Sequence, residues 1–270
     1  GEIHEGLAFL IEHLPASINR LHLVVAGRID PPWPLARMRA HARISELRSR
    51  DLRFSVEEAT AFLNQVMGLS LSARDVTLLD QRTEGWIAGL QMAALSMQDR
   101  ADIAAFLERF SASHRYIMDY LIEEVLSLQS PQVLEFLLKT SILERLTAPL
   151  CEAVTGIQQS QDFLGRLERS NVFLTCLDDD QRWYRYHPLF ADLLRKRLLT
   201  SRGPEVLELR HRAGEWYEAN GMLREAILQA LQDRDMKGVA SLISGNILVL
   251  AEGEALPAFV AEAQRVKRAV

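Results

Sequence analysis

A single histidine stands where a strand-like segment runs into a helix-like one, in the stretch RWYRYHPLFADLLRKRL. His187 precedes Pro188, and proline suits the first position of a helix. The start of a helix offers unpaired backbone N–H groups and a partial positive charge, so it favours an anion. An imidazole beside it could donate to a phosphate, whose charge would favour the protonated ring. The alternative is a histidine that only packs into a turn, and these residues alone favour that alternative.

Arg28 is the second candidate for phosphate chemistry. It follows the apolar segment LHLVVAG, residues 21–27, whose length and composition predict a parallel strand covered on both faces. Ligands of open α/β sheets bind beyond the carboxyl ends of the strands, and a guanidinium there offers a rigid fork of donors to a phosphate. The alternative is a surface cation, solvated or loosely paired with a carboxylate such as Asp30.

No catalytic motif is present in the sequence. It contains no G-x-x-x-x-G-K-[ST] phosphate loop, no G-x-S-x-G and no H-E-x-x-H. The seven histidines lack ligand spacing, and the two cysteines, Cys151 and Cys176, are predicted to be reduced thiols rather than metal ligands. Asp178, Asp179 and Asp180 fall between two predicted strands, where a solvated turn is expected rather than a magnesium site. We therefore predict no catalytic residue and no metal site, and do not expect this chain to be an enzyme by itself.

Composition narrows the class of protein. The 270 residues carry a net charge of −5, so no global basic field favours nucleic acid. No apolar run approaches the roughly 20 residues that span a bilayer and no signal peptide is visible, so we expect a cytoplasmic protein with no membrane partner. The chain opens on Gly1 without a methionine and closes on helix-like sequence, which leads us to expect a fragment of a longer protein.

The fold class that the pattern predicts is mainly α. A helix over 3–15 followed by the strand over 21–27 indicates the end of an α/β sheet domain. Helices dominate from Ser55 onward, where Ser55 and Glu58 form a capping box. Residues 85–98 are apolar on most sides, which predicts a buried helix.

The order helix, helix, helix, hairpin, helix follows, and it is typical of a winged-helix domain. The helices are predicted over 130–143, 148–156, 160–171 and 188–199, and the strands over 172–177 and 182–187. Beyond Pro204 the sequence predicts two antiparallel helices broken at Asn220 and Gly221. The spacing of four residues there is typical of a tetratricopeptide-like hairpin: Trp216, Tyr217, Ala226 and Ala230. A further helix pair is expected from Met236.

Six segments in this order resemble the large ATP-binding regulators of the LuxR family, a group of signal-transduction ATPases with numerous domains (STAND) that includes the maltose-regulon activator. The segments are LHLVVAGRIDPPWPLARMRAHARISELRSRDLRFSVEEATAFL, TEGWIAGLQMAALSM, HRYIMDYLIEEVL, FLLKTSILERL, YRYHPLFADLLRKRL and AGEWYEANGMLREAILQAL. Each is weak alone, and together they are specific and cover almost the whole chain.

The resemblance implies four parts. They are the C-terminal remnant of an α/β nucleotide-binding domain over 1–54, a helical domain over 55–125, a winged-helix domain over 126–202 and incomplete tetratricopeptide-like repeats over 203–270. It implies ATP or ADP with Mg²⁺ as cofactors of a full-length parent, a slow ATPase, and none held tightly by this chain. The implied partners are the parent's own nucleotide-binding and DNA-binding domains, a small-molecule inducer or protein effector at the repeats, DNA through a separate C-terminal domain, and further copies after activation.

The resemblance also assigns roles to individual residues. Arg28 resembles the family's sensor arginine near the γ-phosphate, although Gly27 stands where relatives often have Ser or Thr. His187 resembles the winged-helix histidine that contacts the β-phosphate of bound ADP. Gly85 and Trp86 lie in EGWIAGLQ, which resembles a segment that lines the nucleotide base, but the proline typical of that segment is absent.

Two other functions remain open at this stage. The winged helix could read DNA directly, as the basic run Arg195 to Arg197 would favour, but the acidic tip of the wing opposes this because phosphate contacts dominate DNA affinity. Alternatively, the repeats could form a scaffold that binds a peptide or an effector with no role for a nucleotide. The basic segment from Arg37 to Arg53 could serve partner contact or docking, and a solvated face is the default expectation.

Overall fold

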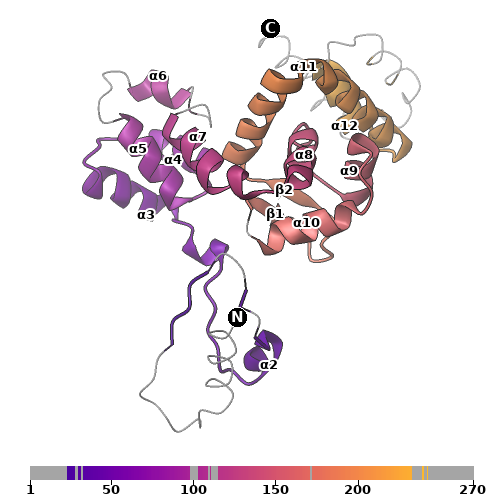
Figure 1. Ribbon diagram of the computed structural model, residues 1–270. Coiled ribbons are helices and arrows are strands. Elements are labelled where there is room, and N and C mark those ends of the chain that lie inside the picture. Colours follow the sequence, from indigo (N-terminus) through magenta and orange to yellow (C-terminus); the bar gives the residue numbers. More distant parts are fainter. Residues whose placement is uncertain are drawn as a thin grey trace, which may run out of the picture.

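The structure is a computed structural model of the 270-residue chain. It describes residues 23–27, 30–31, 33–97, 103–108, 110, 115–170, 172–232, 239 and 242. The described part is mainly helical with one two-stranded sheet, as the sequence predicts. Figure 1 shows two helical lobes side by side, with the segment that carries α2 projecting away from them.

The first lobe is built from short helices. They are α3 (Val56–Ala61), the π-turn η2 (Phe62–Val66), α4 (Ala73–Thr83), α5 (Ile87–Met97), α6 (Ile103–Glu108) and α7 (Arg115–Glu124). The predicted capping box is present, because the Ser55 hydroxyl accepts from the backbone N–H of Glu58 while the Glu58 carboxylate accepts from that of Ser55. Ser72 and Asp75 form the same arrangement at the start of α4.

The second lobe has the helix and hairpin order that the sequence predicts. Its elements are η3 (Leu126–Leu128), α8 (Pro131–Thr140), α9 (Ala148–Thr155), α10 (Ser160–Arg169), β1 (Leu174–Cys176), β2 (Tyr184–Tyr186), α11 (Pro188–Ala219) and α12 (Leu223–Gln232). The two strands are antiparallel, with Leu174 opposite Tyr186. A bridge between Leu146 and Tyr184 adds the segment before α9 to the other edge of β2.

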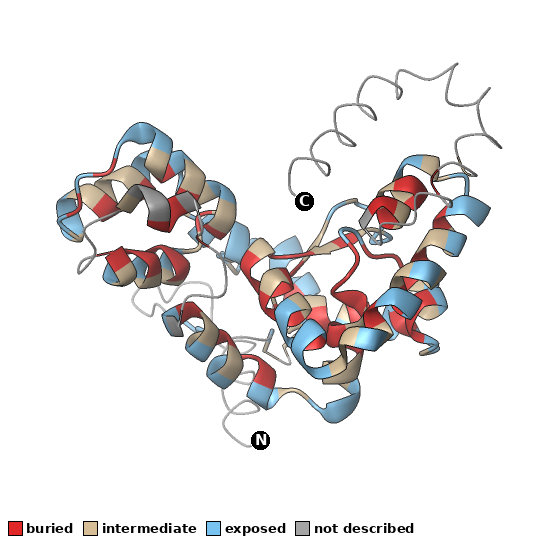
Figure 2. Cartoon of the chain, turned by 90° about the horizontal axis from the view of Figure 1, so that it is seen from above, coloured by how far each residue is buried: buried red, intermediate tan, exposed pale blue. Residues whose placement is uncertain are grey.

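One hydrophobic core connects the two lobes. It runs without interruption from Ala59 in α3 to Ala226 in α12. Figure 2 shows that the buried residues lie on the faces of the helices that point into each lobe, while the outward faces are exposed or half-buried. Among the largest fully buried side chains, Leu90 and Phe110 belong to the first lobe, and Phe136 and Phe190 to the second. The lobes are therefore packed on each other and not merely linked by the chain.

The predicted strand over 21–27 is not found. Its described part, residues 23–27, has no strand conformation, and Val24 is 90% exposed. A parallel strand needs hydrogen-bonded neighbours and covered faces, and the only strands among the described residues are those of the distant hairpin. The following segment instead forms α2 (Leu35–Ala40) and η1 (Ser49–Leu52), which the sequence did not predict. The helix predicted over 3–15 lies outside the described residues.

One helix differs from prediction. In α5 only one face is buried, because Ile87 and Leu95 are exposed, so this helix is not covered on most sides.

The break predicted near Pro204 is found as a kink within α11, where Arg202 leaves helical geometry with φ −145° and ψ 41°. Pro204 lacks the N–H that would bond back to the previous turn, so it loosens the helix without ending it.

The helical hairpin predicted beyond the bend is present. The chain turns at Asn220 and Gly221, where Gly221 has φ +71°. Tyr217 and Ala226 are buried between the second half of α11 and α12. The further pair expected from Met236 falls outside the described residues.

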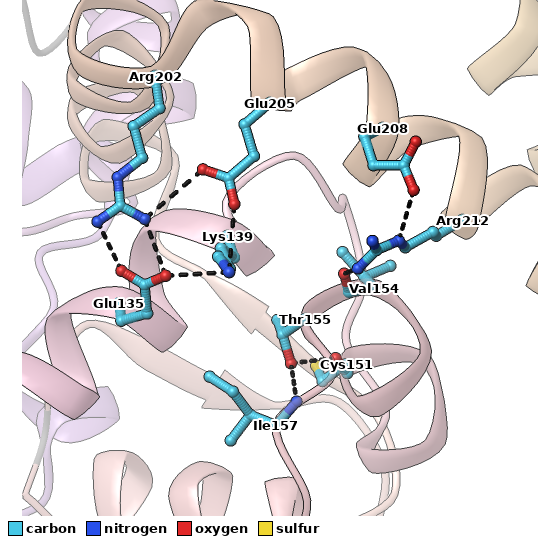
Figure 3. Close-up of polar contacts among 10 residues, drawn as sticks. All are labelled: Glu135, Lys139, Cys151, Val154, Thr155, Ile157, Arg202, Glu205, Glu208 and Arg212. Atoms are coloured by element: carbon cyan, nitrogen blue, oxygen red, sulfur yellow. Dashed lines mark hydrogen bonds and ion pairs between the residues drawn. The ribbon is translucent and has the colours of Figure 1, made fainter.

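A network of charged side chains surrounds the bend of α11 (Figure 3). The two terminal nitrogens of Arg202 donate to the two carboxylate oxygens of Glu135 on α8, at 2.8 and 2.7 Å. Lys139 lies 3.0 Å from Glu135 and 3.2 Å from Glu205, which follows the bend. The Arg202 guanidinium, with the help of Lys139, lowers the pKa of Glu135 to about 2. The network therefore ties α8 to residues at and beyond the bend.

We expect a measurable coupling between Glu135 and Arg202. Urea unfolding of Glu135→Gln, Arg202→Gln and the double variant at pH 7 should give an interaction of about 0.5–1 kcal/mol, since the two groups are partly exposed. The pair Glu208 and Arg212, one turn apart on α11, should give about half of that or less and serves as the comparison.

The pH dependence of the coupling follows from the lowered pKa. A carboxylate with a depressed pKa contributes stability above its unfolded value of 4.5, and that contribution is lost as the pH falls toward about 2. The coupling should therefore be complete at pH 7 and shrink below pH 4.5. A coupling that is zero at pH 7, or one that grows on acidification, would contradict the bidentate contact.

Candidate functional site

His187 is held at the first turn of α11 by backbone contacts. Its N–H donates to the Phe173 carbonyl at 2.8 Å, beside β1, and its own carbonyl accepts from Ala191 at 2.9 Å. It is the residue that precedes α11, with Pro188 at the first helical position. The predicted junction between a strand and a helix is therefore present at His187.

The imidazole of His187 points into the first lobe. Its Nε2 lies 2.8 Å from the backbone oxygen of Thr83, the last residue of α4. A carbonyl oxygen only accepts hydrogen bonds, so Nε2 carries the hydrogen and donates it. The same oxygen accepts the Trp86 N–H at 2.9 Å. The histidine thus connects the winged-helix side of the molecule to the turn between α4 and α5.

The other ring nitrogen has no partner. His187 is only 6% exposed, and its Nδ1 is buried without a hydrogen bond. Burial lowers the pKa of the imidazole, and the neighbouring Arg53 and Arg185 act in the same direction, while the bond to Thr83 and the charge of Glu84 oppose them. The ring is therefore neutral at pH 7, with its hydrogen on Nε2 and a bare lone pair on Nδ1.

The turn that receives His187 has an unusual backbone. Glu84 and Gly85 both have positive φ, 49° and 70°, a region that a residue with a side chain rarely adopts. The N–H of Phe54 donates to the Gly85 carbonyl at 2.9 Å. A Cβ added to Gly85 would lie 2.4 Å from the Phe54 oxygen, so only glycine fits between the turn and the segment before α3.

Glu84 joins three parts of the chain at this turn. Its carboxylate accepts from Arg185 on β2 and from Arg53, whose Nη1 lies 3.4 Å away. The Glu84 side chain is only 17% exposed, so these contacts are partly shielded from water. The turn, the hairpin and the chain before α3 are consequently held by one carboxylate directly beside His187.

Trp86 forms the aromatic wall of the site. Its ring lies 5.0 Å from that of Phe173, 5.6 Å from that of Tyr120 and 5.9 Å from that of His187, in tilted or edge-on geometry. Phe173 has φ 49°, which turns the chain sharply just before β1. The Trp86 and Phe173 rings both contact the imidazole edge-on and contribute to its burial.

Three of the four site residues predicted from sequence are brought together: Gly85, Trp86 and His187. The fourth, Arg28, lies outside the described residues. Asp30, considered as its partner, is paired with Arg48. Sequence reasoning missed Thr83, Glu84 and Arg185, because a backbone carbonyl leaves no signature and an ion pair between residues 101 positions apart follows no local pattern.

Comparisons with known proteins agree with one another. A family model for the MalT winged helix domain matches residues 122–207. The chain is 33% identical over 245 residues to the HTH-type transcriptional regulator MalT of Klebsiella pneumoniae, across 89% of this chain and 27% of that protein. MalT of Yersinia enterocolitica is 34% identical over 238 residues, across 87% and 26%. This chain is MalT-like.

A second kind of protein shares the same region. The serine/threonine-protein kinase PknK of Mycobacterium tuberculosis is 34% identical over 261 residues, which cover 97% of this chain and 23% of that protein. The MalT-like chain thus spans about a quarter of the length of the curated relatives that it matches. The family resemblance predicted from sequence is confirmed, and the predicted winged-helix range of 126–202 lies within the matched residues.

The buried Nδ1 of His187, which has no partner, shows whether the residues here fit a nucleotide phosphate. The family resemblance implies an adenine nucleotide, and a phosphate oxygen would satisfy this buried atom at the start of α11 only with a proton on Nδ1. His187 therefore fits a phosphate as a protonated ring and not as the neutral one, with Trp86 and Gly85 beside it.

Some of the charged side chains weighed for DNA reading make contacts within the winged-helix lobe. Arg195, from the basic run on α11, donates to the Ser141 carbonyl at 2.7 Å and is thereby turned toward α8. On α10, the guanidinium of Arg166 lies 4.9 Å from the ring centre of Phe163. At the wing tip, Asp178 accepts from the backbone N–H of Arg182 and Trp183, both at 2.9 Å, and so closes the turn. The acidic run there builds the hairpin, as a solvated turn would.

Two other features are absent from the part of the chain that the structure describes. No three His, Cys, Asp or Glu side chains gather closely enough there to hold a metal ion. None of the helices described has both the length and the apolar character that crossing a membrane requires. Cys151 is buried, Cys176 is half-buried, and both are free thiols.

The turn at Gly85 yields a prediction with a matched control. Gly85→Ala should lower the free energy of unfolding by about 3 kcal/mol, because it adds both a positive-φ penalty and a backbone clash. Gly156→Ala, which has nearly the same φ of 73° but open space around the new Cβ, should lose only about 1 kcal/mol. Urea or thermal unfolding measures both. Equal losses would show that the close approach of Phe54 to the turn is wrong.

The buried imidazole yields a pH prediction. A histidine whose pKa is lowered by folding contributes stability above its unfolded value of 6.5, and that contribution is lost as the pH falls below it. Acidification from pH 7.5 to 5.5 should therefore lower the melting temperature of the nucleotide-free protein more than that of His187→Gln, whose amide keeps a donor for Thr83 but does not titrate. An equal decrease in both proteins would place the ionisable group elsewhere.

Proposed function

We propose that this chain is the regulatory core of a MalT-like transcription regulator, in which a nucleotide controls how firmly the winged-helix lobe is docked on the first lobe. The observation that carries the proposal is the buried, unpartnered Nδ1 of His187 at the boundary between the lobes. A buried polar atom without a partner costs free energy, and native sites usually satisfy it with a ligand or water. ADP, when bound, supplies a diphosphate whose oxygens are strong hydrogen-bond acceptors, and they partner Nδ1 when that nitrogen carries a proton.

The residues around His187 explain why its ligand would matter for docking. Nε2 of the ring is bonded to Thr83 in the first lobe, while the backbone N–H is bonded to Phe173 in the second. Glu84 links the same turn to Arg185 of the hairpin. Separating the lobes would break the Thr83 and Glu84 contacts together. A ligand that strengthens the hold on His187 therefore favours the docked state, since a ligand shifts an equilibrium through its different contacts in the two states.

The proposal extends to the whole protein through its family. The docked, monomeric state is the one that holds ADP, and exchange for ATP with Mg²⁺ accompanies opening and self-association. An inducer or effector would act on the helical repeats that begin with α11 and α12, and DNA would be contacted by a separate domain. The chain lacks a phosphate loop, so by itself it is not expected to hydrolyse ATP.

The MalT and PknK relatives indicate how widely control of the docking of the two lobes would be used. The region is shared by proteins named as transcriptional regulators and by one named as a protein kinase. A shared docking switch with different output domains accounts for this distribution, because the residues around His187 act between the two lobes and need no particular output.

Replacing His187 tests the proposal. In the natural protein that carries this region together with a phosphate loop, His187→Ala should weaken ADP binding roughly 10- to 100-fold, the worth of one hydrogen bond to a charged group. His211→Ala is the matched control, because His211 is an exposed histidine farther along the same helix. Equilibrium binding of a fluorescent ADP analogue measures both variants, with circular dichroism to establish that each is folded.

Two readouts decide the outcome. Weakened ADP binding in His187→Ala, with basal promoter activity raised and the His211→Ala control unchanged, supports the docking switch. Unchanged ADP retention together with unchanged basal activity would overturn it and leave the repeats as a scaffold without a nucleotide role.

A further inference from the structure

The hydrogen bond between His187 and Thr83 restricts what the ring can do with a second ligand. Nε2 must carry a hydrogen because the Thr83 oxygen has none to offer, at a distance of 2.8 Å. A neutral imidazole has only one N–H. Nδ1 of the neutral ring is therefore an acceptor, and no hydrogen-bond donor is found for it among the described residues.

An acceptor at Nδ1 is the wrong partner for a phosphate. Unprotonated phosphate oxygens carry lone pairs and negative charge, so two acceptors would face each other. The pair becomes attractive only when a proton lies between Nδ1 and the oxygen. With that proton on the ring, the imidazolium donates from both nitrogens, to the phosphate and to Thr83 at once.

We propose that the Thr83 carbonyl fixes the tautomer of His187, so that the histidine can grip a nucleotide phosphate only by taking up one proton. This inference rests on the proposed function, since it concerns the same site. Thr83 is then a positioning residue that acts through its backbone. The chemical step is a proton transfer alone: one proton leaves the solvent and becomes shared between Nδ1 and a phosphate oxygen, and no other bond forms or breaks.

The charges around the ring make the proton depend on the ligand. Arg185 faces it from β2 and Arg53 from the segment before α3, and both disfavour an imidazolium, while Glu84 from the turn favours it. Glu84 pairs with both arginines and offsets part of their charge, and burial is the largest influence on the free ring. A diphosphate adds negative charge next to Nδ1 and reverses the balance.

Acid should then have opposite effects on two properties of the same protein. Without nucleotide, protonation puts an unsatisfied N–H into a buried site and weakens the contact between the lobes. With nucleotide, the same proton completes the hydrogen bond. ADP affinity should thus rise as the pH falls, by up to tenfold per pH unit between the pKa values of the free and the bound ring.

Calorimetry of ADP binding to the full-length protein tests this directly. Titrations at pH 7.5 in two buffers with different ionisation enthalpies give the number of protons taken up per ADP. The wild type should take up close to one proton more than His187→Gln, which keeps a donor for Thr83 but cannot titrate. Proton uptake by other groups is common to both proteins and cancels in the difference.

A measurement on the wild type alone guards against a variant that does not fold. In protein labelled with ¹⁵N-histidine, the nitrogen shifts of His187 should indicate a neutral ring with hydrogen on Nε2 in the free state and a doubly protonated ring with ADP at pH 7.5. A neutral ring in both states would overturn the proposal.

The results separate this inference from the proposed function. Suppose that His187→Ala weakens ADP binding, but that His187→Gln takes up as many protons per ADP as the wild type. The tautomer argument is then wrong and the docking switch stands. If His187→Ala binds ADP as the wild type does, the proposed function itself fails. Weakened ADP binding by His187→Ala, together with one proton fewer taken up by His187→Gln than by the wild type, supports both the docking switch and the tautomer argument.

Discussion

The contact between the first lobe and the hairpin depends on one turn, residues 83–86, and on the side chains and backbone groups that bond to it. The Thr83 carbonyl receives the His187 ring, the Glu84 carboxylate receives two arginines, and Gly85 lets Phe54 approach closely. None of these contacts is large in energy. Together they define a single relative position of the first lobe and the hairpin, because each restricts a different side of the turn. Several modest contacts of this kind fix one geometry, and a ligand of modest affinity can still shift the equilibrium between the docked and separated lobes. Such a site suits a switch better than a rigid core would.

The sequence predicted the helices and the hairpin well because their signals are local. Ser55, Ser72 and Pro131 mark helix starts through hydrogen bonds or ring geometry within one turn of chain, and the capping box at Ser55 is found as predicted. Gly156 and Gly221 likewise mark the ends of elements with positive φ. Such signals do not depend on the rest of the fold, so they hold even in one segment of a larger protein.

The failures of prediction have the opposite origin. The apolar run over 21–27 was expected to be a strand, but a strand is stabilised by its neighbours, and none pairs with the described part, residues 23–27, among the described residues. In the same way, the pattern around His187 identified the residue and the helix start, but not the direction of the ring. That direction is set by a carbonyl 104 residues earlier in the chain. Long-range partners of this kind have no periodicity for a sequence argument to detect.

α11 begins at the site, bends at Arg202 and ends at Ala219. It therefore has two arms, of which the first starts at the imidazole and the second packs against α12. The bidentate contact between Arg202 and Glu135 fastens the point where the arms meet to α8. A rotation of the first arm about Pro188 would consequently have to move this fastening, so the winged-helix lobe and the α11–α12 hairpin would shift as a unit.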